Sequence, residues 1–271
     1  MRTTTRPDLR HAASTLARDN NCRMKAHWKG PRGTLKYLKG TNQLTLKYQA
    51  TNEDPKLKLE VKIYSDADYA RDKDNRRSRT GYAVMTTGGL IVGQSELQTT
   101  IATSTTEAEY QAAATAIKEG LWIRNFIKHL LNTKEVSVTI NIDNQSTLRL
   151  LKNPQSITKA KHIDVQHHFI RERAARKEVK LTNCPTEEML ANFLTKQVPS
   201  SKFNKSIKGL GMNNSCTRLS GSVGKKAPKL GFHPSPGVKM TSGDPPKADG
   251  PRTRDRSSDD AYNIDALAET P

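Results

Sequence analysis

The chain has 271 residues, of which 34% are hydrophobic and only 5% aromatic, so its apolar residues suffice for a compact domain over part of the sequence and not over all of it. The formal net charge of +18 favours a polyanionic partner, with nucleic acid ahead of an acidic membrane surface. Neither a membrane-spanning apolar run nor the apolar core of a signal peptide is found, so we expect no membrane partner and an intracellular protein, cytoplasmic or nuclear.

The three cysteines predict neither a disulfide framework nor a zinc site. Cys22, Cys184 and Cys216 are odd in number, far apart in the sequence, and lack a paired-ligand spacing such as C-x-x-C. Unpaired cysteines agree with a reducing compartment.

The first 55 residues are strongly basic. The segment AHWKGPRGTLKYLKG places Trp28, Leu35 and Leu38 at near-helical spacing and ends on a glycine, which predicts a helix with a glycine cap. A short strand is expected after it, in QLTLKYQ. With so few apolar residues, this region alone could bury little.

A period of two marks the strands that follow. Leu57, Leu59, Val61 and Ile63 alternate with charged residues and run into Asp66, which predicts a half-buried strand. Two antiparallel strands are expected next, the first in GYAVMTT and the second in LIVGQ followed by LQTTIATS, with a Gly-Gly turn before LIVGQ. Together these segments predict a three-stranded meander.

Helices and strands then alternate. A helix over 106–131 carries an apolar stripe at spacings of three and four, and a strand with alternating Val and Ile ends on Asp143. The remaining expected elements are helices in QSTLRLL and KAKHIDVQHHFIRERAARK, a strand in EVKLTNC, and a final helix through EEMLANFLTK, capped by Pro185-Thr186. This order predicts an α/β fold, a mixed five-stranded sheet flanked by helices.

The apolar pattern stops after Met212. Residues 213–271 are rich in Gly, Pro, Ser and Asp, as in SGDPPKADGP, and we predict that they are disordered. They hold nine Lys and Arg against seven Asp and Glu, a net +2, so +16 of the +18 belongs to residues 1–212. The basic charge is therefore expected on the folded part.

Three acidic residues stand at the ends of predicted elements. Asp66 ends the first long strand, Asp143 ends the fourth, and Glu109 lies in the first turns of the long helix. If those two strands are neighbours, the three carboxylates meet, and their repulsion requires cations between them. Ligands that are all oxygen suit Mg²⁺ or Mn²⁺, and two such ions can promote hydrolysis of a phosphodiester. The pattern predicts a two-metal site.

Each of these acids also has a purely structural explanation. Asp66 suits a turn at the end of a strand, and Asp143 suits the start of the next helix. Glu107 and Glu109 each stand three residues after a Ser or Thr, so either could complete a capping box. The residues alone leave these alternatives open.

Several motifs together resemble a known family. YSDADYARDKDNRRSRTGY, SELQTTIATSTTEAEYQ, INIDNQSTLRLLKNP, KHIDVQHHFIRER and CPTEEMLANFLTKQVPSSKF are similar, in this order, to the RNase H region of copia-type retrotransposon polyproteins. TRPDLRHAASTLARDN and AHWKGPRGTLKYLKGT resemble the connection between reverse transcriptase and RNase H in that family. The likeness covers about residues 3–212.

The resemblance implies an RNase H fold that cleaves the RNA strand of RNA/DNA hybrids. It also implies two Mg²⁺ or Mn²⁺ ions held by Asp, Glu, Asp and Asp, which correspond here to Asp66, Glu109 and Asp143, with Asn192 in the fourth place. An amide oxygen can bind a hard cation but adds no charge, so affinity for one ion should fall. Alternatively, Asn192 is an exposed helix residue, or Glu188, four residues earlier on the same helix face, substitutes for the missing acid.

The expected organisation is a connection remnant over 1–55, an RNase H-like domain over 56–212 and a disordered tail over 213–271. The polymerase catalytic region, integrase and protease of such polyproteins are absent from the sequence. Three functional hypotheses remain: an active RNase H, an inactive relic that still binds nucleic acid, and a fragment unstable without its polymerase. A DDE-type integrase is disfavoured, because its Glu follows both Asp residues. The oligomeric state is not predicted.

Overall fold

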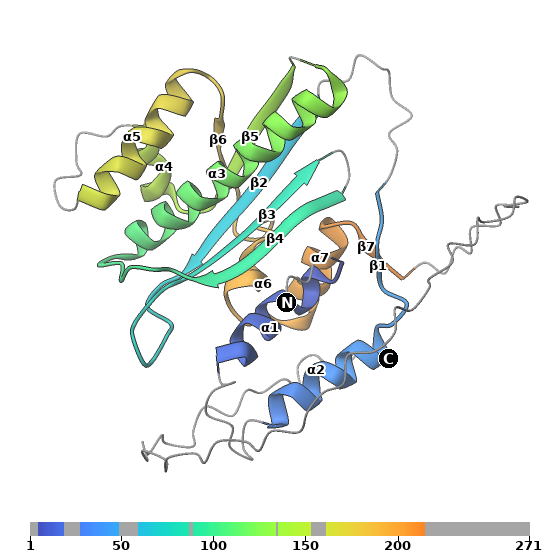
Figure 1. The fold of residues 1–271 in the computed structure, drawn as a ribbon. Coiled ribbons are helices and arrows are strands. Elements are labelled where there is room, and N and C mark those ends of the chain that lie inside the picture. Colours follow the sequence, from blue (N-terminus) through green and yellow to red (C-terminus); the bar gives the residue numbers. More distant parts are fainter. Residues whose placement is uncertain are drawn as a thin grey trace, which may run out of the picture. The chain divides into compact units, whose positions relative to one another are not determined.

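The computed structural model describes residues 5–18, 28–48, 59–86, 89–133, 135–152 and 161–214, with the backbone alone over 161–167. The first elements in chain order are a 3₁₀ helix (Pro7–Leu9), α1 (Arg10–Leu16), α2 (Lys29–Gly40), β1 (Thr45–Leu46), β2 (Leu59–Asp68), β3 (Arg79–Thr86), β4 (Gly89–Leu97) and α3 (Thr105–Leu131). They are followed by β5 (Val136–Ile142), α4 (Gln145–Lys152), α5 (Lys161–Ala175), β6 (Lys180–Asn183), α6 (Asn192–Thr195), α7 (Ser200–Gly209) and β7 (Met212–Asn213) (Figure 1).

The central sheet has five strands in the order β4-β3-β2-β5-β6. β2, β3 and β4 form an antiparallel meander, whereas β5 pairs parallel to β2 and β6 parallel to β5. The expected fold class, an RNase H-like mixed five-stranded sheet flanked by helices, is confirmed, and so is the adjacency of the first and fourth predicted strands of that sheet.

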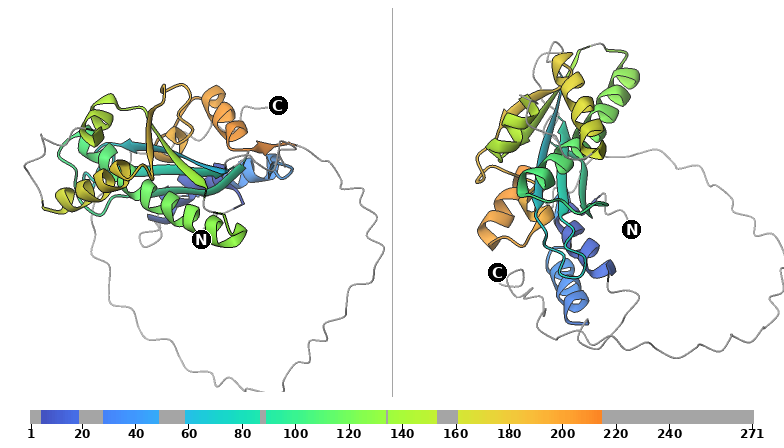
Figure 2. Two further views of the ribbon diagram at one scale, coloured as in Figure 1. Left: turned by 90° about the horizontal axis from the view of Figure 1, so that it is seen from above. Right: turned by 90° about the vertical axis from the view of Figure 1, so that its left-hand side faces the viewer.

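Helices cover both faces of the sheet (Figure 2). On one face, Val61 and Ile63 of β2 pack with the apolar stripe of α3 in the larger core, which also includes residues of α4 and α5. On the other face, Ala83 and Leu90 pack with residues of α6 and α7 in a second core. Alternation along the central strands thus sends apolar side chains to both faces, as burial under two layers of helices requires.

The structure contains several elements that the sequence patterns missed. α1, the 3₁₀ helix and α7 were not predicted, and β7 extends one residue into the predicted tail, where Asn213 pairs with Thr45 of β1. Residues 215–271 of that tail lie outside the described residues. The segment LQTTIATS is not a strand beyond Leu97, where β4 ends.

The N-terminal segment contacts the central sheet directly. Arg79 of β3 donates a hydrogen bond of 2.8 Å to the hydroxyl of Ser14 in α1. The guanidinium of Arg18 lies 2.6 Å from the buried carboxylate of Asp72, in the loop between β2 and β3. These contacts join residues predicted as a connection remnant to the face of the sheet that carries α6, while the domain boundary near residue 55 stays a prediction.

Cys184 is a buried free thiol, whereas Cys22 and Cys216 lie outside the described residues. Among the helices that the structure describes, none combines the length and the apolar character needed to cross a membrane.

A glycine allows α6 to approach the sheet closely. Gly81 of β3 stands opposite Asp66 in the pairing of β2 with β3. A Cβ atom added at Gly81 would lie 2.5 Å from Cγ2 of Thr195, 2.9 Å from Cβ of Leu194 and 3.1 Å from the carbonyl carbon of Leu194. Since one of these neighbours is backbone, α6 would have to move away from the sheet to accept any side chain here.

We therefore expect Gly81→Ala to lower the free energy of unfolding by about 1–3 kcal/mol, the usual cost of overpacking. Gly40→Ala is the matched control, because nothing lies within 4 Å of a Cβ added there, and it should be neutral or gain up to about 1 kcal/mol. Urea unfolding of both variants measures the difference. Equal stability of the two would contradict the close approach of α6.

Candidate metal centre

Asp66 lies within β2, two residues before the strand ends, and its carboxylate is buried. The hydroxyl of Thr195 donates a hydrogen bond to Oδ2 of Asp66, and Nζ of Lys196 lies 3.4 Å from the same oxygen. Because Asp66 pairs with Gly81 in the ladder, the explanation of Asp66 as a turn residue at a strand end is wrong.

Asp143 directly follows β5 and is half-buried. The parallel pairing aligns Ser65 of β2 with Ile142 of β5, so the next residue of each strand, Asp66 and Asp143, extends from the same end of the sheet. The start of α4 does not use Asp143: Oδ1 of Asn144 accepts a hydrogen bond of 3.0 Å from the backbone N–H of Thr147. Asn144 is therefore the capping residue, and Asp143 is free of that role.

Glu109 lies in the second turn of α3 and is buried. The helix begins after Ser104, whose hydroxyl accepts a hydrogen bond of 3.1 Å from the backbone N–H of Glu107. The carboxylate of Glu107 in turn accepts a bond of 2.7 Å from the backbone N–H of Thr103. Glu107 is thus a capping residue, whereas the capping explanation of Glu109 is wrong, because that residue lies inside the helix.

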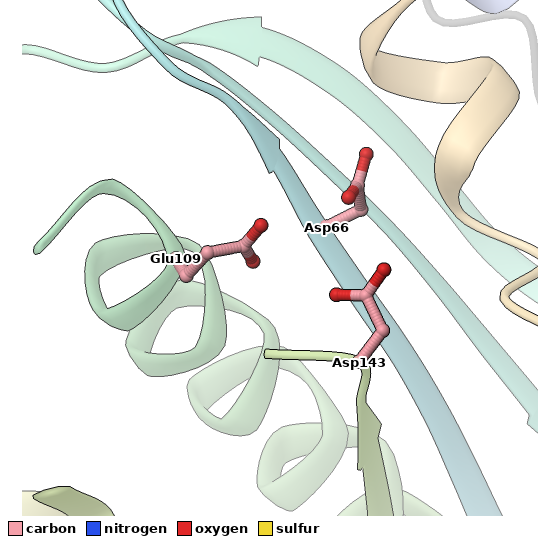
Figure 3. Close-up of side chains that lie close together, drawn as sticks. All are labelled: Asp66, Glu109 and Asp143. Atoms are coloured by element: carbon pink, nitrogen blue, oxygen red, sulfur yellow. The ribbon is translucent and has the colours of Figure 1, made fainter. Parts of the chain in front are cut away.

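The three carboxylates converge (Figure 3). Asp66, Glu109 and Asp143 each offer one oxygen, and these three oxygens lie within 4.8 Å of one another. Oε2 of Glu109 is buried and has no hydrogen-bond partner among the described residues. An unpartnered buried oxygen is costly unless a cation or a proton satisfies it. Three anionic oxygen ligands, one of them unpartnered, fit a hard divalent cation such as Mg²⁺ or Mn²⁺.

The pKa values of two carboxyl groups in this cluster agree with a cation site. Burial, followed by the charges of Asp66 and Asp143, raises the pKa of Glu109 well above the usual value. Burial and then the charge of Asp66 also raise the pKa of Asp143. Without a bound cation, Glu109 and Asp143 therefore hold protons more strongly than exposed carboxyl groups do.

Asn192 begins α6 and is fully buried, so the alternative of an exposed helix residue is wrong. Its amide nitrogen donates a hydrogen bond of 3.1 Å to the backbone carbonyl of Thr186, whose hydroxyl donates one of 3.4 Å to Asp143. Oδ1 of Asn192 is buried without a hydrogen-bond partner in the part of the chain that the structure describes. Asn192 is connected to the cluster in this way, but its role as a metal ligand stays a prediction.

The predicted helix through EEMLANFLTK is too long. Residues 186–188 form a turn, and the helix comprises only Asn192–Thr195. Glu188 is exposed and does not share a helix face with Asn192, so the argument that it substitutes for the missing acid loses its geometric basis.

Thr195, Lys196 and Thr186 were not identified from the sequence, although all three contact the carboxylates. Thr195 and Lys196 reach Asp66 only because α6 lies against β3 at Gly81, more than a hundred residues away in the chain. No local pattern of residues indicates such a contact.

Comparison with known proteins establishes the family. No protein-family model matches the chain. The retrovirus-related Pol polyprotein from transposon TNT 1-94 of Nicotiana tabacum is 41% identical over 211 residues, 78% of this chain and 15% of that polyprotein. The one from transposon RE2 of Arabidopsis thaliana is 30% identical over 208 residues, 77% of this chain and 14% of that polyprotein. The chain belongs to the copia-type retrotransposon Pol polyproteins. It spans only a small part of their length.

Among solved structures, LC11-RNase H1 in complex with RNA/DNA hybrid matches with a TM-score of 0.38 and 15% identity, over 54% of this chain and 99% of that one. The candidate metal site of this copia-type chain is inferred from the geometry of its own residues and from its sequence family.

The raised pKa of Glu109 predicts a dependence of stability on pH. The folded protein retains the Glu109 proton more strongly than the unfolded chain, so without metal its stability falls as the pH rises above the ordinary value of 4.5. We expect Glu109→Gln, which is neutral at every pH, to unfold at a higher temperature than the wild type at pH 8 in EDTA. The difference should shrink as the pH approaches about 4. A difference independent of pH would contradict the buried, cation-free carboxylate.

Proposed function

We propose that this chain is a retrotransposon RNase H domain that hydrolyses the RNA strand of RNA/DNA hybrids with divalent metal ions. One observation carries the proposal: three carboxylates, two buried and one half-buried, come from distant parts of the chain and offer oxygens within 4.8 Å of one another. The family supports the same conclusion, because the motifs that resemble the RNase H region of copia-type polyproteins contain these same three residues.

The residues proposed to hold the ions are Asp66, Glu109 and Asp143, with Asn192 as a neutral fourth position. When bound, two Mg²⁺ or Mn²⁺ ions supply an activated water and stabilise the leaving oxygen of the phosphodiester. The chain supplies rigid ligand positions: Asp66 lies on β2, Asp143 directly follows the adjacent parallel strand β5, and Glu109 lies on the helix packed over these strands. Such fixed positions keep the cost of organising the site low.

The proposed substrate is a nucleic acid because the basic charge is large and part of it is exposed in the loop that follows the strand of Asp66. Residues 1–212 carry a net charge of +16. Four basic residues follow Asp66 in the loop between β2 and β3 and are exposed to solvent, namely Arg71, Lys73, Arg76 and Arg77. Exposed Lys and Arg gain affinity for phosphates by releasing counterions.

A second candidate is a catalytically inactive protein that retains nucleic-acid binding. The observation that favours it is Asn192, which is neutral where the family pattern implies an acid. A site with one carboxylate fewer binds divalent ions less tightly. The two candidates share the basic surface and differ in metal occupancy.

A cleavage assay tests the function. We expect the purified protein to cleave the RNA strand of a labelled RNA/DNA hybrid in Mg²⁺ or Mn²⁺, and Asp143→Asn to be slower by at least about 100-fold, because it removes a direct ligand. The variant should still bind the hybrid with the salt dependence of the wild type. Binding without cleavage by the wild type in either metal would reject the enzyme and favour the second candidate.

Restoring the fourth acid tests the role of residue 192. We expect Asn192→Asp to increase the cleavage rate at limiting Mn²⁺ by about 10-fold, because it adds a charged ligand. In EDTA the same variant should be less stable than the wild type, because the buried carboxylate loses the hydrogen bond to the Thr186 carbonyl and gains no cation. An unchanged metal dependence would place residue 192 outside the metal site.

A further inference from the structure

Lys196 is a positive charge built into the carboxylate cluster. Its Nζ lies 3.4 Å from Oδ2 and 3.5 Å from Oδ1 of Asp66, so the ammonium contacts both oxygens of that carboxylate. The Asp66 side chain is 2% exposed, whereas the Lys196 side chain is 40% exposed. The buried anion therefore has a partner that reaches it from the solvent side.

The fold fixes this lysine near the cluster. Lys196 directly follows α6 and caps it, because its backbone N–H donates a hydrogen bond of 3.1 Å to the carbonyl of Asn192. The preceding residue, Thr195, donates its hydroxyl to the same carboxylate. Two consecutive residues of one short segment thus bind Asp66, and Gly81 on the neighbouring strand allows that segment to lie there.

The charge of Lys196 affects the pKa values of carboxyl groups other than Asp66. Burial dominates the raised pKa values of Glu109 and Asp143, and the Lys196 ammonium opposes that rise at both carboxyl groups. Burial also raises the pKa of Asp68, two residues after Asp66 on β2, and the Lys196 ammonium, like Arg71, opposes that rise. One cation therefore offsets part of the repulsion among four acids, which is also what a bound metal ion would do.

The Lys196 ammonium and a divalent metal ion would both bind the carboxylate oxygens of Asp66. A divalent ion requires carboxylate oxygen as a direct ligand, and Asp66 contributes to the proposed metal site. An ammonium on a flexible four-carbon stem that is partly in water can leave a carboxylate without breaking the fold. The lysine is thus suited to leave when a metal ion arrives.

We propose that Lys196 is the resident counter-ion of Asp66 in the metal-free protein, and that divalent metal binding displaces its ammonium from this carboxylate. Lys196 is accordingly a positioning residue that sets how readily the metal binds. The inference rests on the proposed function in taking Asp66 as a metal ligand.

The pairing itself is tested without metal. In EDTA at pH 8, we expect Lys196→Met to lower the unfolding temperature by roughly 2–4 °C in the wild-type background and by clearly less in an Asp66→Asn background, where only the more distant acids remain. Lys62→Met is the matched control, because Lys62 lies on β2, the strand that carries Asp66, is 55% exposed and pairs with Glu60 at 3.5 Å, not with the cluster. The control should show no dependence on residue 66. Additive effects of Lys196→Met and Asp66→Asn would overturn the pairing.

The displacement is tested by Mn²⁺ titration calorimetry, which needs no activity. We expect Lys196→Met to bind Mn²⁺ about fivefold more tightly than the wild type, because no ammonium has to leave, and Lys196→Arg and Lys62→Met to resemble the wild type. Equal or weaker binding by Lys196→Met would overturn the displacement. If no variant binds Mn²⁺, the proposed metal site fails and the displacement fails with it, while the metal-free double-mutant comparison still decides whether Lys196 pairs with Asp66.

Discussion

The structure depends on the parallel pairing of β2 with β5, which brings like charges together at one end of the sheet. Ser65 and Ile142 are partners in this pairing, so the residues that follow them, Asp66 and Asp143, lie side by side at the same end of the two strands. α3 packs on the same two strands and adds Glu109. The three acids repel each other, and this repulsion destabilises the fold. The burial of the hydrophobic core beneath them is favourable and offsets that cost.

Elements packed on the second face of the sheet position the residues that contact Asp66. α6 is only one turn long, yet it supplies Asn192, Thr195 and the adjoining Lys196. A helix so short has little stability of its own and takes its position from packing, here from Phe193 and Leu194 in the second core. The core that contains the N-terminal strand β1 and the late elements α7 and β7 thus also fixes the partners of Asp66.

The elements with a strong period could be predicted from the sequence, and those set by tertiary contacts could not. The alternation in β2 and β5 and the stripe of α3 indicated the central sheet and its helix. The positions of Asp66, Glu109 and Asp143 at the ends of these elements then indicated the cluster. The helix expected over 187–196 failed because its first half turns away to bury Met189 and expose Glu188. Lys196 was missed because its partner is far away in the sequence.

Both faces of the sheet contribute to the net charge of the site: β2, β5 and α3 position the three acids, and α6 with the adjoining Lys196 adds an amide and an ammonium. The family pattern implies four acids around two divalent ions, whereas this chain has three acids in the cluster, a buried neutral amide at Asn192 and one ammonium. A less negative cluster attracts the second ion less strongly. Since the strands and α3 already hold the three carboxylates within reach of one another, the geometry of the site is retained. Under the proposed function, the number of ions that the site holds sets the activity, and that number depends on charge and not on fold.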